Sequence, residues 1–138
     1  MKEEFKSQII SLKNELDLDI VKTDDERVWL RPKGWKKYLF GYSFESGNIF
    51  YGITENAPET NDEKYIEAIN YVNHKLNCAY EYGGVWPIFK YLNMQIISSP
   101  DFWITVKNGS SKEEIKNFIK VMIEKYETDD EFLNENEI

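Results

Sequence analysis

The sequence predicts an α+β fold, an antiparallel sheet of about four strands with helices packed on one face. Three observations lead to this prediction. Aromatic residues alternate through positions 38–44, as in a half-buried strand. Two later stretches repeat apolar residues at helical spacing. The expected order along the chain is helix, three strands, helix, strand and helix, and such grouping of strands is typical of α+β domains rather than of parallel α/β folds.

The first elements follow from local periodicity. Residues 2–16 predict a helix, because apolar residues at positions 5, 9, 12 and 16 lie on one face. The sequence Asp17-Leu18-Asp19 then interrupts the helical spacing and ends the predicted helix. Residues 27–31 predict a strand, with Val28 and Leu30 on one side and Trp29 on the other. Pro32 and Gly34 then end that strand.

The clearest signal is a hairpin. Residues 38–44 place four aromatic rings on one face, and residues 49–54 resume a strand after the turn chemistry of residues 45–48. We expect strand 27–31 to lie beside this pair.

The second half predicts two capped helices. Residues 60–63 and 111–114 both fit a capping box, in which a hydroxyl and a carboxylate satisfy free backbone amides. The first box opens a helix that runs to about Leu76, and the second opens a helix that runs to Tyr126. Residues 77–99 look irregular, and residues 102–106 predict a short strand.

Length and charge predict one domain with a tail. The chain has 138 residues, close to the usual size of a single domain. We expect this domain to span residues 1–126. The net charge of −8 is uneven, because residues 127–138 contain six acids and no Lys or Arg. We therefore interpret residues 127–138 as an acidic C-terminal tail.

Composition argues against several kinds of site. A single cysteine, Cys78, excludes an internal disulfide and a multi-cysteine zinc site, and a single histidine, His74, excludes a His-rich metal site. We expect a solvated or boundary His74, a small buried apolar role for Cys78, no cofactor and no metal. The chain has no long apolar run and does not open like a signal peptide, so we expect a cytoplasmic protein that does not bind membranes.

A recurrent pattern begins at Gly34-Trp35. It continues through Tyr38–Phe44, Phe50-Tyr51-Gly52-Ile53, Val85-Trp86-Pro87, Phe89-Lys90-Tyr91, Phe102-Trp103-Ile104 and Asn108-Gly109. In this order the chain resembles, over roughly residues 8–126, the region C-terminal to the catalytic core in a bacterial family of the PD-(D/E)XK nuclease superfamily. The resemblance implies an accessory domain without its nuclease.

The nuclease signature itself is matched only by short strings. Pro100-Asp101 with Glu114-Ile115-Lys116 imitates the superfamily's acids and lysine, as does Asp62-Glu63-Lys64. The resemblance implies metal-binding acids on core strands, whereas Glu114 is predicted to face a backbone amide at a helix start. A metal-dependent nuclease is thus our third hypothesis, and we expect no enzyme.

Two segments are candidate binding residues. The first is rich in aromatic rings, which would line a pocket, form an interface or cap the end of the sheet: Tyr80, Tyr82, Trp86, Phe89, Tyr91 and Trp103. The second is basic and would meet phosphates or guard a sheet edge: Arg31, Lys33, Trp35, Lys36 and Lys37. For the basic segment we favour the sheet-edge interpretation.

These observations predict a non-enzymatic binding module that recognises a protein or a nucleic acid through an aromatic-rich surface. A protein is the favoured partner. The alternative is a small acidic inhibitor of a nucleic-acid enzyme or defence system, of the kind that phages encode, whose carboxylates imitate a nucleic-acid backbone. Partner charge separates the two, since the inhibitor would bind a basic enzyme.

Overall fold

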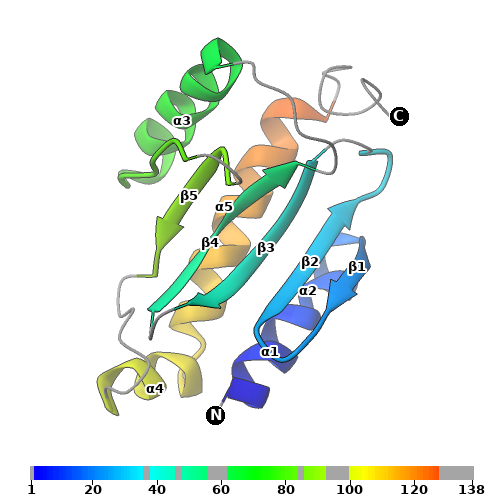
Figure 1. The fold of residues 1–138 in the computed structure, drawn as a ribbon, viewed down its shortest axis with the longest axis vertical. Helices are drawn as coiled ribbons and strands as arrows, with labels where there is room; N and C mark the ends of the chain where they lie inside the picture. The colour runs from blue at the N-terminus through cyan, green and yellow to red at the C-terminus, as the bar shows by residue number, and fades with distance from the viewer. Residues whose placement is uncertain are drawn as a thin grey trace.

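The computed structural model describes residues 2–35, 38–45, 48–55, 62–83, 86–92 and 100–127. It confirms the α+β class with an antiparallel sheet. The strands are β1 (Leu18–Thr23), β2 (Arg27–Pro32), β3 (Tyr38–Glu45), β4 (Asn48–Glu55) and β5 (Ile88–Tyr91). They lie in the order β1-β2-β3-β4-β5, and each pairs antiparallel with the next (Figure 1).

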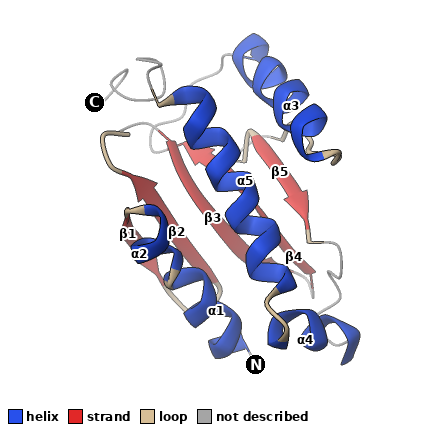
Figure 2. Ribbon diagram, turned by 180° about the vertical axis from the view of Figure 1, so that it is seen from behind, coloured by secondary structure: helices blue, strands red, loops and turns tan. Residues whose placement is uncertain are grey.

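The described helices are α1 (Lys2–Ile10), α2 (Leu12–Leu16), α3 (Asp62–Leu76), α4 (Pro100–Lys107) and α5 (Ser110–Tyr126). Figure 2 shows α1, α2 and α5 in front of the sheet, with α5 running across its centre. Helix α3 packs beside α5 near β5, and α4 contacts α5 at its N-terminal end. Helices α1, α2, α3 and α5 therefore lie on one face of the sheet, as predicted, whereas α4 lies beyond the strand ends.

The β3–β4 hairpin supplies the centre of the core. Tyr38, Phe40, Tyr42 and Phe44 are all buried, which confirms the shared face predicted from their alternation. The ring of Phe40 meets Phe118 of α5 at 5.8 Å between centroids, and Tyr42 meets Phe5 of α1 at 4.8 Å. Edge-to-face pairs of this kind add to the free energy of burial. The apolar stripes of α3 and α5 close the core.

Two glycines let the strands approach each other closely. A Cβ atom added to Gly41 would lie 2.3 Å from the Val28 carbonyl oxygen, and one added to Gly52 would lie 1.9 Å from the Ile88 carbonyl oxygen. Both added atoms would point away from the helices, since these residues alternate with the buried aromatic positions. A larger residue at either position would therefore have to displace the neighbouring strand, β2 or β5.

The predicted strand at 102–106 is wrong, because these residues lie in α4. The run contains Ile104, Thr105 and Val106, which favour strands. Pro100 occupies the first helical position, where a fixed φ and a missing N–H cost nothing. Burial of Val106 against the core then outweighs the local preference.

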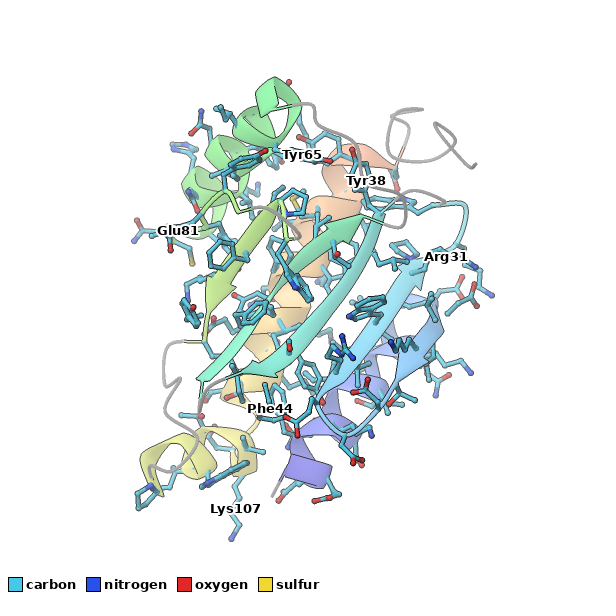
Figure 3. The ribbon with its side chains drawn as sticks, viewed as in Figure 1. Arg31, Tyr38, Phe44, Tyr65, Glu81 and Lys107 are labelled. Carbon is cyan, nitrogen blue, oxygen red and sulfur yellow. The ribbon has the colours of Figure 1, made fainter. Side chains whose placement is uncertain are left out.

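Two strands, β1 and β5, were not predicted from the sequence. In β1 the pairing with β2 shifts between Ile20 and Lys22, so the strand lacks regular alternation. In the segment expected to be irregular, β5 pairs with β4 over four residues. Its outer edge is bridged to Glu81, whose N–H donates to the Phe89 carbonyl at 2.8 Å (Figure 3).

The predicted capping box at 111–114 is also wrong. Helix α5 begins at Ser110, and its N-cap is Gly109 with a φ of 83° and no side-chain cap. The hydroxyl of Ser111 instead pairs with that of Thr105 at 2.8 Å. At the other predicted box, Thr60 and Asn61 lie outside the described residues, as do residues 128–138 of the predicted tail.

Candidate functional site

One face of the sheet carries no described helix. In Figure 1 the strands lie in front and α1, α2 and α5 lie behind them. Strand alternation and register assign the side chains of this face, called the open face below. They are Asp19 and Lys22 of β1, Arg27, Trp29 and Arg31 of β2, Leu39, Gly41 and Ser43 of β3, Phe50, Gly52 and Thr54 of β4, and Phe89 and Tyr91 of β5. The residues named on β3 and β4, at the centre of the face, are buried, whereas Lys22 and Tyr91 at its two sides are exposed.

An aromatic cluster occupies the β4–β5 side of the open face. Phe50 lies at its base, with ring centroids 5.1 Å from Trp86, 6.2 Å from Phe89 and 6.0 Å from Tyr91. Phe50 is nearly covered by these neighbours, whereas Tyr91 is 41% exposed. The aromatic cluster (Phe50, Trp86, Phe89, Tyr91) thus presents a solvent-accessible ring on a packed base.

A tryptophan with cationic neighbours occupies the β1–β2 side. The Lys22 ammonium lies 5.2 Å from the centre of the Trp29 ring, and the Arg27 guanidinium lies 5.9 Å from it. Arg31 follows on the same face of β2, and Figure 3 labels it there. The Trp29 indole Nε1 is buried, and within the described part of the chain it has no hydrogen-bond acceptor.

Cations and acids are mixed on the open face. Lys22, Arg27 and Arg31 share it with Asp19 and with Glu81, which pairs with Phe89 at the β5 edge. Asp24, Asp25 and Glu26 line a hollow beside Arg27. The full chain has a net charge of −8. Asp24, in the β1–β2 turn, pairs with Arg27 at 3.2 Å, and both side chains of that pair remain largely exposed.

The predicted aromatic segment does not form one surface. Trp86, Phe89 and Tyr91 gather in the aromatic cluster. Tyr80 is buried and stacks on Phe118 at 4.6 Å, on the helix side of the sheet. The remaining two lie elsewhere: Tyr82 is 6.0 Å from the ring of Tyr65, and Trp103 is a partly buried residue of α4.

The predicted basic segment is also divided. Arg31 lies on the open face, whereas Lys33 lies 3.8 Å from the carboxylates of both Asp17 and Asp19. Trp35 is 2% exposed and packs on Phe40 in the core, so its ring is closed to ligands. Lys36 and Lys37 lie outside the described residues. Sequence reasoning missed Lys22 and Phe50, whose place on the open face depends on register.

A second constellation lies on the helix side. The Tyr51 hydroxyl donates to Glu114 Oε2 at 2.8 Å and lies 2.6 Å from the Tyr80 hydroxyl. Since Tyr51 has one proton, Tyr80 is the donor of that second bond. Lys90 Nζ donates to the same Glu114 oxygen at 3.0 Å. Burial raises the pKa of Tyr51 and that of Tyr80, so both phenols are neutral donors.

The Glu114 network (Tyr51, Tyr80, Lys90, Glu114) joins β4, β5 and the segment after α3 to α5. Asn73 holds Tyr80 in place, because its side chain accepts from the Tyr80 N–H at 2.6 Å and donates to the Tyr80 carbonyl at 3.1 Å. Glu114 also borders a cavity of about 520 Å³ at the N-terminal end of α5, which Thr105, Asn108, Glu113 and Asn117 also line.

The residues that the sequence suggested for metal binding or catalysis lie in separate places in the structure. Within the described residues, no three His, Cys, Asp or Glu side chains are placed to hold a metal ion together. His74 is exposed, and Cys78 is partly buried, with its thiol donating to the Leu76 carbonyl. Asp101 lies in α4 and Glu114 in α5.

The fold is a five-stranded antiparallel meander with helices on one face and aromatic and charged side chains on the other. No protein-family profile, curated protein or solved structure matches the chain. None of the described helices is both long and apolar enough to cross a membrane.

Proposed function

We propose that this protein is a non-enzymatic binding module that holds a macromolecular partner on the open face of its sheet. The observation that supports this most is the aromatic cluster, because its rings gather on the face opposite the helices. Tyr and Trp are enriched among the residues that dominate binding energy at interfaces.

The packing of the aromatic cluster suits this role. Phe50, Phe89 and Trp86 fix one another by edge contacts, so the exposed Tyr91 ring loses little rotamer freedom on binding. Partly exposed rings on a rigid base are what an interface anchor requires.

The Glu114 network supports a binding role over an enzymatic one. The Glu114 carboxylate is already engaged by Tyr51 and Lys90, and all three groups stabilise the attachment of α5 to the sheet. A structural function therefore accounts for the polar side chains of the Glu114 network.

The predicted acidic inhibitor depends mainly on acids within 128–138, which lie outside the described residues. We keep it as an outcome of the partner experiment. Partner selection through those acids would survive changes to the aromatic cluster.

The test compares two surface variants that each remove one large exposed side chain. Tyr91→Ser changes the open face, whereas Ile104→Ser changes α4, where Ile104 is 57% exposed. Tagged protein is purified from its native cells and the bound macromolecules are identified. We expect Tyr91→Ser to lose a partner that Ile104→Ser retains. Equal retention by both variants would contradict the proposed function.

A further inference from the structure

We infer that β1 is the contact edge of a symmetric dimer, in which it pairs antiparallel with β1 of a second copy of this chain. The inference concerns a different surface from the proposed function and does not rest on it. Strand β1 lies at one end of the strand order, and within the described residues only β2 pairs with it (Figure 1). The outer edge of β1 therefore offers backbone N–H and C=O groups to another strand.

The second half of β1 is exposed on both faces of the sheet. Ile20 lies opposite Leu30, a buried residue on the helix side, yet Ile20 itself is 37% exposed. Val21 is 41% exposed, and Lys22 and Thr23 are exposed as well. In β2, by contrast, every second residue is buried. The helices thus leave two apolar side chains of β1 uncovered, and a strand lying along this edge would bury them beside its own side chains.

The shift in the β1–β2 pairing determines how a second copy would lie. Asp19 pairs with Arg31, and Lys22 pairs with Trp29, so both belong to the open face although they are three residues apart. In a regular strand, residues three apart point to opposite faces. Asp19 and Lys22 therefore share a face only because the pairing passes over Val21.

This arrangement makes the edge complementary to itself. When two copies of β1 lie antiparallel with Asp19 opposite Lys22, the two-fold symmetry also places Lys22 opposite Asp19 of the second copy. The exposed Ile20 then lies opposite Val21 of the second copy, and Val21 lies opposite Ile20. Opposite charges in facing positions stabilise a strand pair, whereas like charges destabilise it. The dimer therefore gains two ion pairs and buries four apolar side chains.

Other registers lack this match. A copy shifted so that Asp19 faces Asp19, or Lys22 faces Lys22, brings like charges together. A shift by one residue in either direction removes the facing pairs of Asp19 and Lys22. Lysines and pairing shifts on an edge strand usually oppose contact with other sheets. Here the acid at position 19 offsets the lysine in one register, which selects another copy of β1 as the partner.

The existing contacts of these two side chains do not oppose the pairing. Lys33 lies 3.8 Å from the Asp19 carboxylate, whose side chain is 46% exposed, and such surface pairs contribute little to stability. Lys22 contacts the Trp29 ring from an exposed position. Both charged groups can therefore turn toward a second copy at small cost.

The acids that flank β1 are matched within each copy. Asp17 would approach Asp24 of the second copy, and like charges there would weaken the pairing. However, Lys33 lies 3.8 Å from Asp17, and Arg27 lies 3.2 Å from Asp24. Each acid therefore meets the second copy together with a cation of its own.

Pairing at an edge leaves both faces of the sheet free. The two five-stranded sheets would join into one, with both open faces on the same side, because Asp19 and Lys22 meet on that side. The aromatic cluster lies at the β4–β5 side of each copy, so the dimer would present two such clusters to a partner. Two six-residue edges bury less than the roughly 1,200 Å² of standard interfaces, so we expect a reversible dimer.

The experiment is sedimentation velocity of the full chain from about 10 μM to about 1 mM, the range in which a small interface associates. We expect the unmodified chain to pass from monomer to dimer as its concentration rises. Asp19→Lys places four positive charges in facing positions, and Lys22→Asp places four negative ones. Each variant is expected to weaken dimerisation by at least about fourfold.

The decisive sample is an equal mixture of the two variants. In a heterodimer of Asp19→Lys with Lys22→Asp, opposite charges face each other again at both positions, so we expect association to recover. The double variant Asp19→Lys/Lys22→Asp should regain the homodimer for the same reason. The controls Glu4→Lys and Lys75→Asp change the net charge equally at exposed positions of α1 and α3. They should leave dimerisation within about twofold, because charges remote from the contact are screened. Circular dichroism verifies that every variant is folded.

Three results would overturn the inference. The first is a chain that stays monomeric throughout this concentration range. The second is a dimer that neither single variant weakens more than the controls do. The third is a mixture of Asp19→Lys and Lys22→Asp that associates no better than each variant alone. The proposed function is tested separately, at Tyr91 on the opposite side of the sheet.

Discussion

At Glu114, one carboxylate oxygen accepts from both a phenol and an ammonium group. Replacing Glu114 by Gln keeps an oxygen for the Tyr51 hydroxyl but removes the negative charge that faces Lys90, whose side chain is only 13% exposed. We expect Glu114→Gln to lower the free energy of unfolding by about 1–2 kcal/mol, since hydrogen bonds to charged groups are the stronger ones. Urea denaturation measures this change.

The control is Glu113→Gln, the exposed neighbour on the same helix turn. It removes the same charge without touching the Glu114 network, so its effect should stay within about 0.5 kcal/mol. If the two variants were equally stable, Glu114 would not contribute to holding α5 on the sheet.

Gly52 is a second residue whose identity the structure explains. A methyl group there would overlap the Ile88 backbone. Backbone atoms of a paired strand cannot move aside as the end of a flexible side chain can. We expect Gly52→Ala to destabilise the fold by about 2 kcal/mol or more, by displacing β5. Gly109→Ala provides the comparison, because its added methyl group would have no neighbour within 4 Å. Its only cost is the strain of a positive φ, about 1 kcal/mol. Thermal unfolding of both variants would show the difference, and a Gly52→Ala variant as stable as Gly109→Ala would contradict the close strand approach.

Among the elements, α2 is tied to α5 by an ion cluster. Glu15 of α2 accepts from Lys112 and from Lys116, the latter at 2.8 Å. These hydrogen bonds lower the pKa of Glu15 from 4.5 to about 2. A carboxyl whose pKa is lower in the folded state stabilises the fold above its unfolded pKa, and that contribution is lost as the pH falls from about 4.5 to about 2.

The corresponding variant is Glu15→Gln, which should reduce stability at pH 7 by less than about 1 kcal/mol because the cluster is partly exposed. The difference from the unmodified protein should shrink as the pH falls through that window. Glu4→Gln, on the exposed side of α1, serves as the control. A difference that stayed constant from pH 7 to pH 2 would show that the lysines do not stabilise the Glu15 carboxylate. Urea midpoints measured across this pH range provide the test.

Elements with a strong period were predictable from the sequence. The hairpin face of Tyr38, Phe40, Tyr42 and Phe44 and the stripe of α5 both lie against the core, so burial enforces their periodicity. The elements that were not predicted lack such a periodicity. In β1 a shift in pairing interrupts alternation, and in α4 the burial of Val106 outweighs residues that favour strands. The start of α5 was not predicted because its N-cap is Gly109, and the Asn108 side chain, rather than that of Ser111, accepts from the Ser110 N–H.

The binding residues were predictable only in part, because the open face is assembled by register. Phe89 and Tyr91 were in the predicted aromatic set, but Phe50 joins them from β4. Likewise Lys22 reaches Trp29 across β1 and β2. Proximity in sequence suggested Trp35 as a ligand contact, and its place in the core shows why a linear cluster of basic and aromatic residues does not define a surface.

For the whole molecule, the distribution of charge makes a further prediction. Residues 127–138 contain six of the acids that give the chain its net charge of −8. Truncation after Tyr126 removes these acids and leaves the apolar stripe of α5 intact, so it should change the free energy of unfolding by less than about 1 kcal/mol. Urea denaturation of the full and truncated chains measures this change. A larger loss of stability would show that residues 127–138 contribute to the fold.

The most direct test of the open face as the binding surface is a nuclear magnetic resonance titration that observes the indole N–H signals of the four tryptophans. Trp29 and Trp86 lie on or beside the open face, whereas Trp35 is buried in the core and Trp103 lies on α4. On addition of the macromolecule that co-purifies with the tagged protein, we expect the Trp29 and Trp86 signals to shift and those of Trp35 and Trp103 to stay in place. Shifts confined to Trp103, or no shift in any signal at a saturating concentration of that partner, would contradict the account.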